Sequence, residues 1–463
     1  MPSQSNHKLT GLERIGPKGY LRYVFPFQLQ ENYNPDEVAR VIQAGYEALT
    51  QRIPEVAYEA VPDPDAKQKG VMRFQRPDDT DMLVKVQVKD LRDSFPSSYA
   101  ELKLRGFPVA AFDGEMLCRR SVWPVAGEER LPISLVQANF IRGGLVLTWC
   151  ILHMAGDGTS FYTWTKIWAE GCRRAQGLDV PHPIQLPEAI WKDRERVMEP
   201  SGRNAGRLDD HPEYTLLPFT PPGVPPKMLS LSHRGQVFYF SPESLAALKA
   251  EASPANATQP SDQPWISTND ALSALLWRTV MAAQSPLETL AGDPVSIFNI
   301  AIDGRQRTDP KLHPDTLGCF LEYVAVSAPI REMLGSLNLA DLAIRIRKSI
   351  LVAGNQFTDD VVTLVAQLED VDRLVPTALL DVPGFNCVQS SWINFDLYAL
   401  DWGALLGGKI EAVRVPSVGC INGAQIVLPM LPDGGMEVLI GVEGGCLGRV
   451  LSDPLFTRFG VAR

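Results

Sequence analysis

The chain has 463 residues, of which 45% are hydrophobic and 21% are charged, and its formal net charge at pH 7 is −10. This length exceeds what one hydrophobic core normally serves, so the sequence predicts two domains of roughly 200 residues each. The composition is typical of a globular protein and excludes long disordered or fibrous segments. The acidic balance, without a cluster of basic residues, disfavours nucleic acid and anionic membranes as partners.

Cysteine usage and the first residues bear on the cellular compartment. The seven cysteines are scattered and form no C-x-x-C pair, which disfavours both a disulfide framework and a structural zinc site. No segment reaches the roughly 18 uncharged apolar residues that a membrane span needs. Residues 1–22 are polar and lack the apolar core of a secretory signal. We therefore expect a cytoplasmic protein that does not contact membranes.

Strand and helix patterns alternate in residues 1–199, which we expect to form one domain. An apolar, β-prone strand at 145–152 is followed by apolar residues at helical spacing over 159–176. In chain order the other predicted elements are a strand at 21–29, a helix at 35–52, β-prone stretches at 71–76 and 82–88, and a strand at 133–140 that pairs with 145–152 through a turn at 142–144.

The composition changes at residues 200–226, which hold seven prolines and fit neither a strand nor a helix. We expect a proline-rich interdomain crossover at 200–230 and a second domain at 231–463. In that domain, Ser267 and Asp270 form an S/T-x-x-D cap before an apolar helix. The other elements predicted there are a strand at 236–240, a helix at 245–252, a strand at 295–302, helices at 339–352 and 360–368, and a hairpin of 426–430 and 436–442.

The stretch from His153 to Gly158 is the best candidate for chemistry. His153 directly follows an apolar strand and Asp157 precedes a helix, so the sequence predicts a histidine at a strand-to-helix junction. A histidine held in this way can act as a general base. A structural interpretation also remains open, with His153 bonded to a backbone carbonyl and Asp157 capping the helix.

Other chemistries lack the residues that they require. Metal binding by His153 and Asp157 has no H-x-x-x-H, H-E-x-x-H or cysteine pair to complete the ligand shell. Gly156 and Gly158 belong to neither a G-x-x-x-x-G-K-[ST] nor a G-x-G-x-x-G phosphate-binding loop. A serine hydrolase is disfavoured because the G-x-S-x-G motif is missing from the sequence.

Two further clusters combine charged or aromatic residues. Residues 303–307 read Asp-Gly-Arg-Gln-Arg, and their two arginines could pair with an internal carboxylate or with a phosphorylated cofactor. A surface turn is the alternative. Residues 398–403 read Tyr-Ala-Leu-Asp-Trp-Gly and lie near Trp392 and Phe395, so they could equally belong to an aromatic core.

In four motifs taken in chain order, the sequence resembles the BAHD acyltransferase family, and most closely its fungal branch of trichothecene 3-O-acetyltransferase-like proteins. These motifs are His153-x-x-x-Asp157-Gly158, Ser267-Thr268 before a helix rich in alanine and leucine, Asp303-x-Arg305-x-Arg307, and Leu400-Asp401-Trp402-Gly403. The resemblance implies an α/β fold with mixed sheets, made of two chloramphenicol-acetyltransferase-like domains with a channel between them. It also implies an acyl-CoA-dependent O-acyltransferase, specifically an O-acetyltransferase, acting on a hydroxyl of a terpenoid, alkaloid or polyketide.

The resemblance assigns roles to individual residues. His153 matches the family's general base, which takes the proton of the acceptor hydroxyl during direct transfer in a ternary complex. Asp157 matches a structural aspartate that pairs with an arginine, here Arg305, and Gly158 supports the same loop. No metal or permanently bound cofactor is implied. The residues expected to bind the co-substrate acyl-CoA are Arg307, Ser267, Thr268, Asp401, Trp402 and Gly403.

The remaining expectations concern the acceptor and the rival functions. The small-molecule alcohol is expected in a pocket lined by aromatic side chains, which could also be core residues: Phe27, Phe320, Trp392 and Tyr398. One alternative is a condensation-type enzyme that takes its acyl group from a carrier protein. Another is a member that binds or cyclises a ligand without acyl transfer, and N-acylation of an amine is a nearer variant. Both walls of the channel come from one chain, so we expect a monomer.

Overall fold

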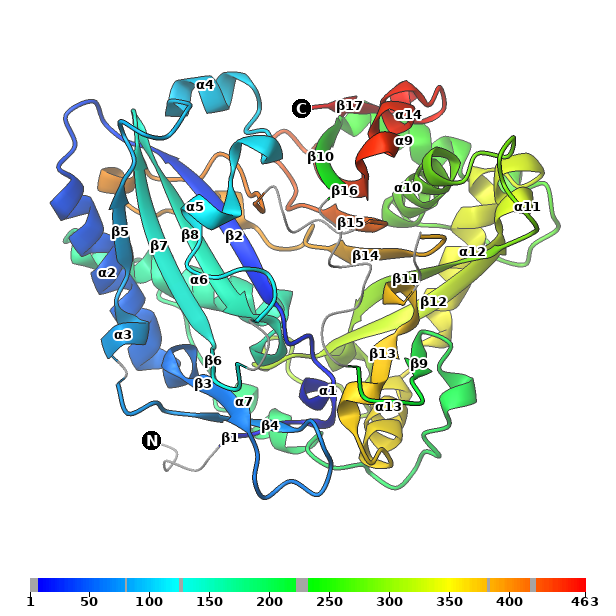
Figure 1. Cartoon of the computed structure of the whole chain (residues 1–463), viewed down its shortest axis with the longest axis horizontal. Helices are drawn as coiled ribbons and strands as arrows, with labels where there is room; N and C mark the ends of the chain where they lie inside the picture. Colours follow the sequence, from blue (N-terminus) through cyan, green and yellow to red (C-terminus); the bar gives the residue numbers. More distant parts are fainter. Residues whose placement is uncertain (1–6, 80, 125–127, 222–231, 381–383, 417–421) are drawn as a thin grey trace.

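The computed structural model describes residues 7–79, 81–124, 128–221, 232–380, 384–416 and 422–463. They form a mixed α/β fold with a seven-stranded sheet, two four-stranded sheets and a two-stranded sheet, which confirms the predicted fold class. Figure 1 shows one four-stranded sheet on the left of the molecule and the strands of the seven-stranded sheet on the right. The cavity described below lies where these two sheets meet.

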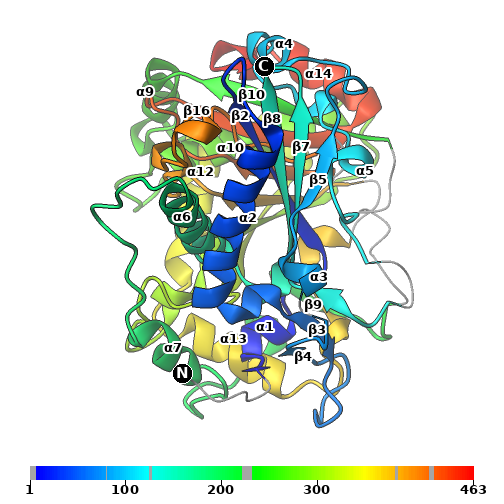
Figure 2. The same cartoon turned by 90° about the vertical axis from the view of Figure 1, so that its left-hand side faces the viewer.

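The four-stranded sheet beside the cavity belongs to the amino-terminal half of the chain. Its strands, in spatial order, are β2 (Tyr20–Gln28), β8 (Gly144–Leu152), β7 (Ser134–Ile141) and β5 (Gln87–Asp90). Helices α2 (Pro35–Arg52) and α6 (Gly158–Ala175) pack against each other beside this sheet (Figure 2). Every residue of β7 and β8 is buried, so the centre of the sheet is covered on both faces.

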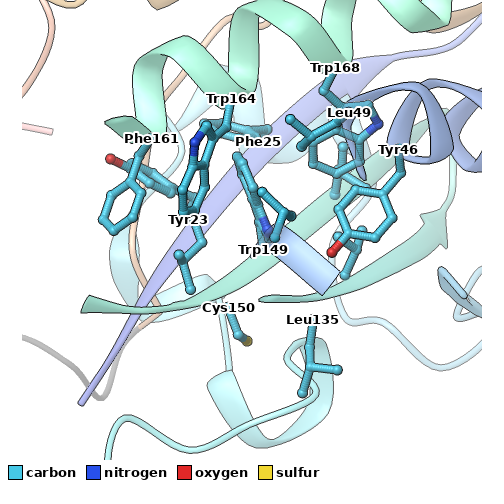
Figure 3. Close-up of a cluster of buried hydrophobic side chains, with 14 of the residues drawn as sticks. Tyr23, Phe25, Tyr46, Leu49, Leu135, Trp149, Cys150, Phe161, Trp164 and Trp168 are labelled. Carbon is cyan, nitrogen blue, oxygen red and sulfur yellow. The ribbon is translucent and has the colours of Figure 1, made fainter. Parts of the chain in front are cut away.

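Aromatic side chains fill the space between α6 and the sheet. Figure 3 shows Phe161, Trp164 and Trp168 along α6, beside Trp149 of β8. Trp149 packs edge-to-face on Trp168 with ring centroids 5.2 Å apart, an arrangement that aromatic pairs favour. This tightly packed core fixes the helix that begins five residues after His153.

The seven-stranded sheet has the spatial order β12-β11-β14-β15-β16-β10-β17. Its strands are β10 (His233–Phe240), β11 (Val295–Asp303), β12 (Leu321–Pro329), β14 (Cys387–Ser391), β15 (Ala424–Val427), β16 (Met436–Glu443) and β17 (Gly460–Ala462). Strand β14 runs parallel to both of its neighbours, β11 and β15. Helices α10 (Thr268–Gln284) and α12 (Leu339–Val352) pack together and share a hydrophobic core with this sheet.

Shorter elements surround these two sheets. The other four-stranded sheet has the order β1-β4-β3-β6, and β9 pairs with β13. The bounds are β1 (His7–Lys8), α1 (Gly11–Arg14), β3 (Glu59–Pro62), β4 (Met72–Gln75), α3 (Asp81–Val84), α4 (Tyr99–Leu104), α5 (Gly114–Leu117), β6 (Leu131–Pro132), α7 (Ala189–Glu195), β9 (Tyr214–Leu216), α9 (Pro242–Glu251), α11 (Ile330–Gly335), α13 (Phe357–Ala366), β13 (Leu374–Pro376) and α14 (Leu447–Ser452).

Most predicted elements are present where a local signal defined them. Helices α2 and α12 have the predicted bounds, because each begins after an asparagine cap and buries one face. The predicted cap of α10 is also confirmed. The Ser267 side chain accepts from the Asp270 backbone N–H at 3.1 Å, and the Asp270 carboxylate accepts from the Ser267 N–H at 2.6 Å.

Two predictions about secondary structure are wrong. The β-prone stretch at 82–88 contains a helical turn, α3, and the strand begins only at Gln87. The crossover at 200–226 contains the short strand β9, whose partner β13 lies far along the chain and gives no local signal. Residues 222–231 of the expected crossover lie outside the described residues, and the division into domains at 200–230 stays a prediction.

The segment around Trp402, late in the chain, packs into the hydrophobic core of the amino-terminal half of the chain. Trp402 is fully buried there, with ring centroids 5.4 Å from Phe27 and 5.5 Å from Trp168. Close by, Val24 of β2 forms an isolated antiparallel bridge with Arg414. The aromatic residues of the segment therefore complete the packing against β2 and α6.

Two further features concern the helices and the cysteines. No helix in the described ranges is long and apolar enough to cross a membrane. Five cysteines of those ranges are free thiols: Cys118, Cys150, Cys172, Cys319 and Cys446.

Replacing Trp402 tests this packing. We expect Trp402→Ala to lower the free energy of unfolding by about 3–5 kcal/mol, because it leaves a cavity among Phe27, Trp168 and their neighbours. Trp265 is a matched control, since this residue is 52% exposed and its ring contacts the Arg347 guanidinium; Trp265→Ala should cost about 1 kcal/mol or less. Urea denaturation measures both, and equal losses would contradict a core role for Trp402.

Candidate functional site

His153 stands at the end of β8, as the sequence predicts. A short 3-10 turn, His153–Ala155, separates the strand from α6. The His153 backbone N–H donates to the Gly19 carbonyl at 2.9 Å, and Nδ1 lies 3.1 Å from the Gly156 carbonyl oxygen. A carbonyl oxygen only accepts hydrogen bonds, so Nδ1 carries the ring proton. Nε2 is then the unprotonated nitrogen that can accept a proton.

The surroundings of His153 favour its neutral form. The ring packs edge-to-face on Phe161 with centroids 5.6 Å apart. Burial lowers the pKa of His153 below its usual value, and the charge of Asp157 and the hydrogen bond to Gly156 offset this only in part. At neutral pH the imidazole is therefore available as a base.

Asp157 is fully engaged by groups other than His153. Its Oδ2 accepts from Arg305 Nη1 at 2.6 Å and its Oδ1 from Arg305 Nη2 at 3.0 Å. The same carboxylate caps α6 by accepting the Ser160 N–H at 3.2 Å, and it accepts the Phe320 N–H at 2.8 Å. Asp157 therefore holds the loop in place, and the Gly156 carbonyl is the group that orients His153.

Arg305 is inaccessible to solvent and follows strand β11. Besides Asp157, it donates to the Thr316 carbonyl at 2.7 Å and to Asp303 Oδ1 at 3.0 Å, and its guanidinium lies 4.5 Å from the centre of the Phe320 ring. Burial opposes the charge, but the two carboxylates outweigh it and raise the pKa of Arg305 above its usual value. The residue therefore remains a cation that joins β11 to the start of α6.

Close contacts explain why residues 158 and 160, at the start of α6, are small. A Cβ atom on Gly158 would lie 2.4 Å from the Phe395 ring, so any larger residue there would displace that ring. Ser160 Oγ donates to the Gly318 carbonyl at 2.9 Å and accepts the Gly318 N–H at 3.0 Å. Ser160 was not predicted, although it occupies the third residue after the capping Asp157, where a cap contact is common.

A cavity of about 120 Å³ opens beside His153, between the seven-stranded sheet and the four-stranded sheet that contains β8. Six of the predicted site residues line this cavity: His153, Asp157, Gly158, Arg305, Phe320 and Trp392. Sequence reasoning missed the other residues that line it: Leu21, Thr159, Ala301, Ile302, Asp303, Leu321, Ser390, Ser391 and Phe395. Asp303 could have been found, because it begins the motif that contains Arg305.

Phe27 and Tyr398 do not line this cavity, and their place in an acceptor pocket stays a prediction. Strand β2 runs antiparallel to β8, so its first residue, Tyr20, pairs with Leu152 next to His153. Phe27 pairs with Leu145 at the far end and lies in the aromatic core, roughly 20 Å along the strand. Tyr398 is also buried in this core, where its hydroxyl accepts the Val413 N–H at 3.2 Å.

The residues predicted to bind acyl-CoA are dispersed. Trp402 is buried in the core, and Asp401 forms an ion pair with Arg173 at the surface. Gly403 has φ +87°, a conformation that glycine adopts without strain.

The other predicted acyl-CoA residues lie at the ends of secondary structures. Ser267 caps α10 and accepts from Arg347 at 2.9 Å, and Thr268 is the first residue of that helix. Arg307 donates to the Ala353 carbonyl. None of these residues lines the cavity of His153, so their role in binding acyl-CoA stays a prediction.

Two family descriptions match the chain. Residues 20–172 match the trichothecene 3-O-acetyltransferase-like N-terminal domain, and residues 120–443 match the Transferase family.

Individual relatives cover nearly the whole chain. The eremophilane O-acetyltransferase prx11 of Penicillium rubens is 27% identical over 489 residues, covering 99% of both proteins. The enoyl-CoA isomerase/hydratase claC of Penicillium crustosum is 26% identical over 452 residues, which are 96% of this chain but only 50% of that relative. The structure of F. graminearum TRI101 complexed with coenzyme A and deoxynivalenol has a TM-score of 0.84 at 22% identity, covering 99% of each chain.

The ion pair can be tested by removing its anion. We expect Asp157→Ala to lower the free energy of unfolding by about 3–5 kcal/mol, because Arg305 would remain buried without its main partner. The control Asp262→Ala removes an exposed partner of Lys348 and should leave the free energy of unfolding almost unchanged, because surface ion pairs stabilise a fold little. Chemical denaturation measures both losses. A loss for Asp157→Ala as small as that of the control would contradict a structural role for the pair.

Proposed function

Because the chain belongs to the Transferase family and is a trichothecene 3-O-acetyltransferase-like member of its fungal BAHD branch, we propose that it transfers an acyl group directly from acyl-CoA to a hydroxyl of a secondary metabolite. The single observation that carries this proposal is the position of His153. Its Nδ1 is held by the Gly156 carbonyl, and it lines the cavity between the two large sheets. A base with an unprotonated Nε2 meets the first requirement of such a reaction.

The reaction requires one base and no covalent enzyme intermediate. His153 Nε2 takes the proton of the acceptor hydroxyl while the oxygen attacks the carbonyl carbon of the thioester. The tetrahedral intermediate then collapses, the carbon–sulfur bond breaks, and the imidazolium returns its proton to the departing thiolate. Among the residues that the structure describes, His153 is the histidine that lines the cavity, and it suffices for both proton transfers.

Asp157 and Arg305 act in this proposal as positioning residues. Their pair fixes the first turn of α6 against β11, and the loop that carries His153 lies between β8 and that turn. Gly158 permits the close approach of Phe395, which closes the cavity on that side. The base is thereby held at a fixed place in the cavity wall, as proton transfer requires.

The relatives suggest the two substrates. The similar TRI101 structure holds coenzyme A, and prx11 is named an eremophilane O-acetyltransferase. Acetyl-CoA and an eremophilane alcohol, a sesquiterpenoid, are therefore the first pair to try. Phe320, Trp392 and Phe395 give the cavity an apolar wall that suits a terpenoid or polyketide acceptor.

Replacing the base tests the mechanism. We expect His153→Ala to lower kcat for transfer from acetyl-CoA by about 10²–10⁴-fold, the range for loss of a general base. The control His182→Ala changes an exposed histidine and should retain the wild-type rate. Release of free CoA, followed with a thiol reagent, measures both. If His153→Ala retained the wild-type rate, the proposed base would be wrong, and turnover only with acyl-carrier donors would favour a condensation-type enzyme instead.

The pH dependence provides an independent check. Protonated His153 cannot accept a proton, so kcat/KM should fall as the pH drops through the pKa of this residue. Since burial lowers that pKa, the acid limb should have its midpoint below about 6.5 and the rate should be level near pH 7. Initial rates from about pH 5 to about pH 8 measure this. A midpoint above 7 would contradict a neutral, buried base.

A further inference from the structure

Phe161 lies in the first turn of α6 and contacts the imidazole of His153 from inside the protein. The two rings pack edge-to-face at an angle of 64°, with centroids 5.6 Å apart, an arrangement that aromatic pairs favour. Phe161 is inaccessible to solvent and is not among the described residues that line the cavity. Its ring therefore acts on the imidazole from within the core and not on a substrate.

The same ring supports the group that orients the imidazole. A Cβ atom on Gly156 would lie 2.8 Å from Phe161 Cε1, so the backbone of Gly156 packs closely against this ring. The Gly156 carbonyl oxygen lies 3.1 Å from His153 Nδ1. Phe161 thus contacts both partners of the hydrogen bond that keeps the ring proton on Nδ1.

The aromatic core of the amino-terminal half keeps Phe161 in place. The centroids of the Phe161 and Trp164 rings are 5.4 Å apart, and Figure 3 shows Phe161 at one end of the row that it forms with Trp164 and Trp168 along α6. The Phe161 backbone N–H donates to the Asp157 carbonyl at 2.9 Å. The helix and the core leave this ring little freedom, so it can restrain the imidazole.

The charged groups near the imidazole are engaged elsewhere. Asp157 and Asp303 both accept from Arg305. Helix α1, which packs against the turn that begins with the histidine, contributes Glu13, which pairs with Arg194. Among the described residues none of these side chains bonds the imidazole. The orientation of the ring therefore depends on the backbone carbonyl and on the aromatic contact.

We propose that Phe161 is a positioning residue, which holds the His153 imidazole against the Gly156 carbonyl so that the unprotonated Nε2 meets the substrates. This inference rests on the proposed acyl transfer, because it concerns the base of that reaction. An imidazole that is free to turn about its Cβ–Cγ bond loses the contact with the carbonyl, and its ring proton can then sit on either nitrogen. A proton on Nε2 would prevent this atom from accepting the proton of the acceptor hydroxyl.

Replacing Phe161 by leucine tests the role of the ring. Phe161→Leu keeps the position buried and apolar but removes the flat ring, so we expect kcat with acetyl-CoA and an eremophilane alcohol to fall by roughly 10–10²-fold. KM for acetyl-CoA should change little, because the ring contacts the base and not the donor. The matched control is Phe456→Leu, which removes a buried ring in edge-to-face contact with Phe238 of the other core. It should lower the melting temperature by a similar amount and leave kcat unchanged.

Nuclear magnetic resonance of protein with ¹⁵N-labelled histidine measures the proposed effect without any substrate. The chain has six histidines, and the spectrum of His153→Ala identifies the signals of this residue. Above about pH 7 the wild type should carry the ring proton on Nδ1 alone, whereas Phe161→Leu should show a mixture of the two tautomers. A merely structural role of Phe161 would leave the tautomer unchanged.

The pH profile separates positioning from burial. Phe161→Leu keeps the imidazole buried and should leave the acid limb of kcat/KM at the wild-type pH. Phe161→Ala also admits water beside the imidazole. Because burial lowers the pKa of His153, this second variant should move the limb upward, toward about 6.5.

The inference about Phe161 is wrong if Phe161→Leu keeps either the wild-type kcat or a single tautomer, or if Phe456→Leu loses kcat to the same extent. Failure of Phe161→Leu to fold, while Phe456→Leu folds, would assign Phe161 to the core alone and would overturn the proposal too. If the wild type releases no CoA from acetyl-CoA with the alcohol, the proposed function fails with these substrates. The tautomers of the wild type and of Phe161→Leu then decide the inference by themselves.

Discussion

The geometry of the cavity depends on the buried ion pair between Asp157 and Arg305. Burying two charges is favourable only when they meet in good geometry and their remaining hydrogen-bonding positions are filled. Here the two hydrogen bonds of the pair measure 2.6 and 3.0 Å, and the backbone groups of Phe320 and Thr316 satisfy other hydrogen-bonding positions of the two side chains. The pair thus joins the start of α6 to the end of β11. Loss of either partner would leave a buried charge beside the cavity.

In a Ser-His-Asp triad, one carboxylate both orients the histidine and stabilises the imidazolium, whereas among the described residues no carboxylate bonds His153 here. There, the carboxylate bonds the histidine directly and orients it. Here both oxygens of Asp157 are used by Arg305 and by backbone N–H groups, and the Gly156 carbonyl orients His153. Without a bonded carboxylate, the imidazolium is less stabilised, and burial lowers the pKa of His153. A low pKa suits His153 as a base, because it must be neutral before each turnover and must give up the accepted proton before that turnover ends.

Sequence reasoning succeeded where local or family motifs carried the information. The strand before His153 and the cap of α6 by Asp157 follow from residue pattern, and the partnership with Arg305 follows from the resemblance. The cavity wall was harder to predict, because an aromatic residue fits a core or a pocket equally well. Phe27 lies at the end of β2 remote from His153, and only the strand pairing reveals this. Strand β14 was missed because it is short and ends in polar residues.

The segment that starts with β14 links the cavity to the aromatic core of the other sheet. Ser391 belongs to the seven-stranded sheet, and Trp402, eleven positions later in the sequence, packs against Phe27 of β2. Between them, Trp392 and Phe395 line the cavity. The segment is thus anchored at both ends by packing in two different sheets, which limits how far its cavity side chains can move. Trp402 therefore supports the site by fixing the wall that carries Trp392 and Phe395, without itself touching the cavity.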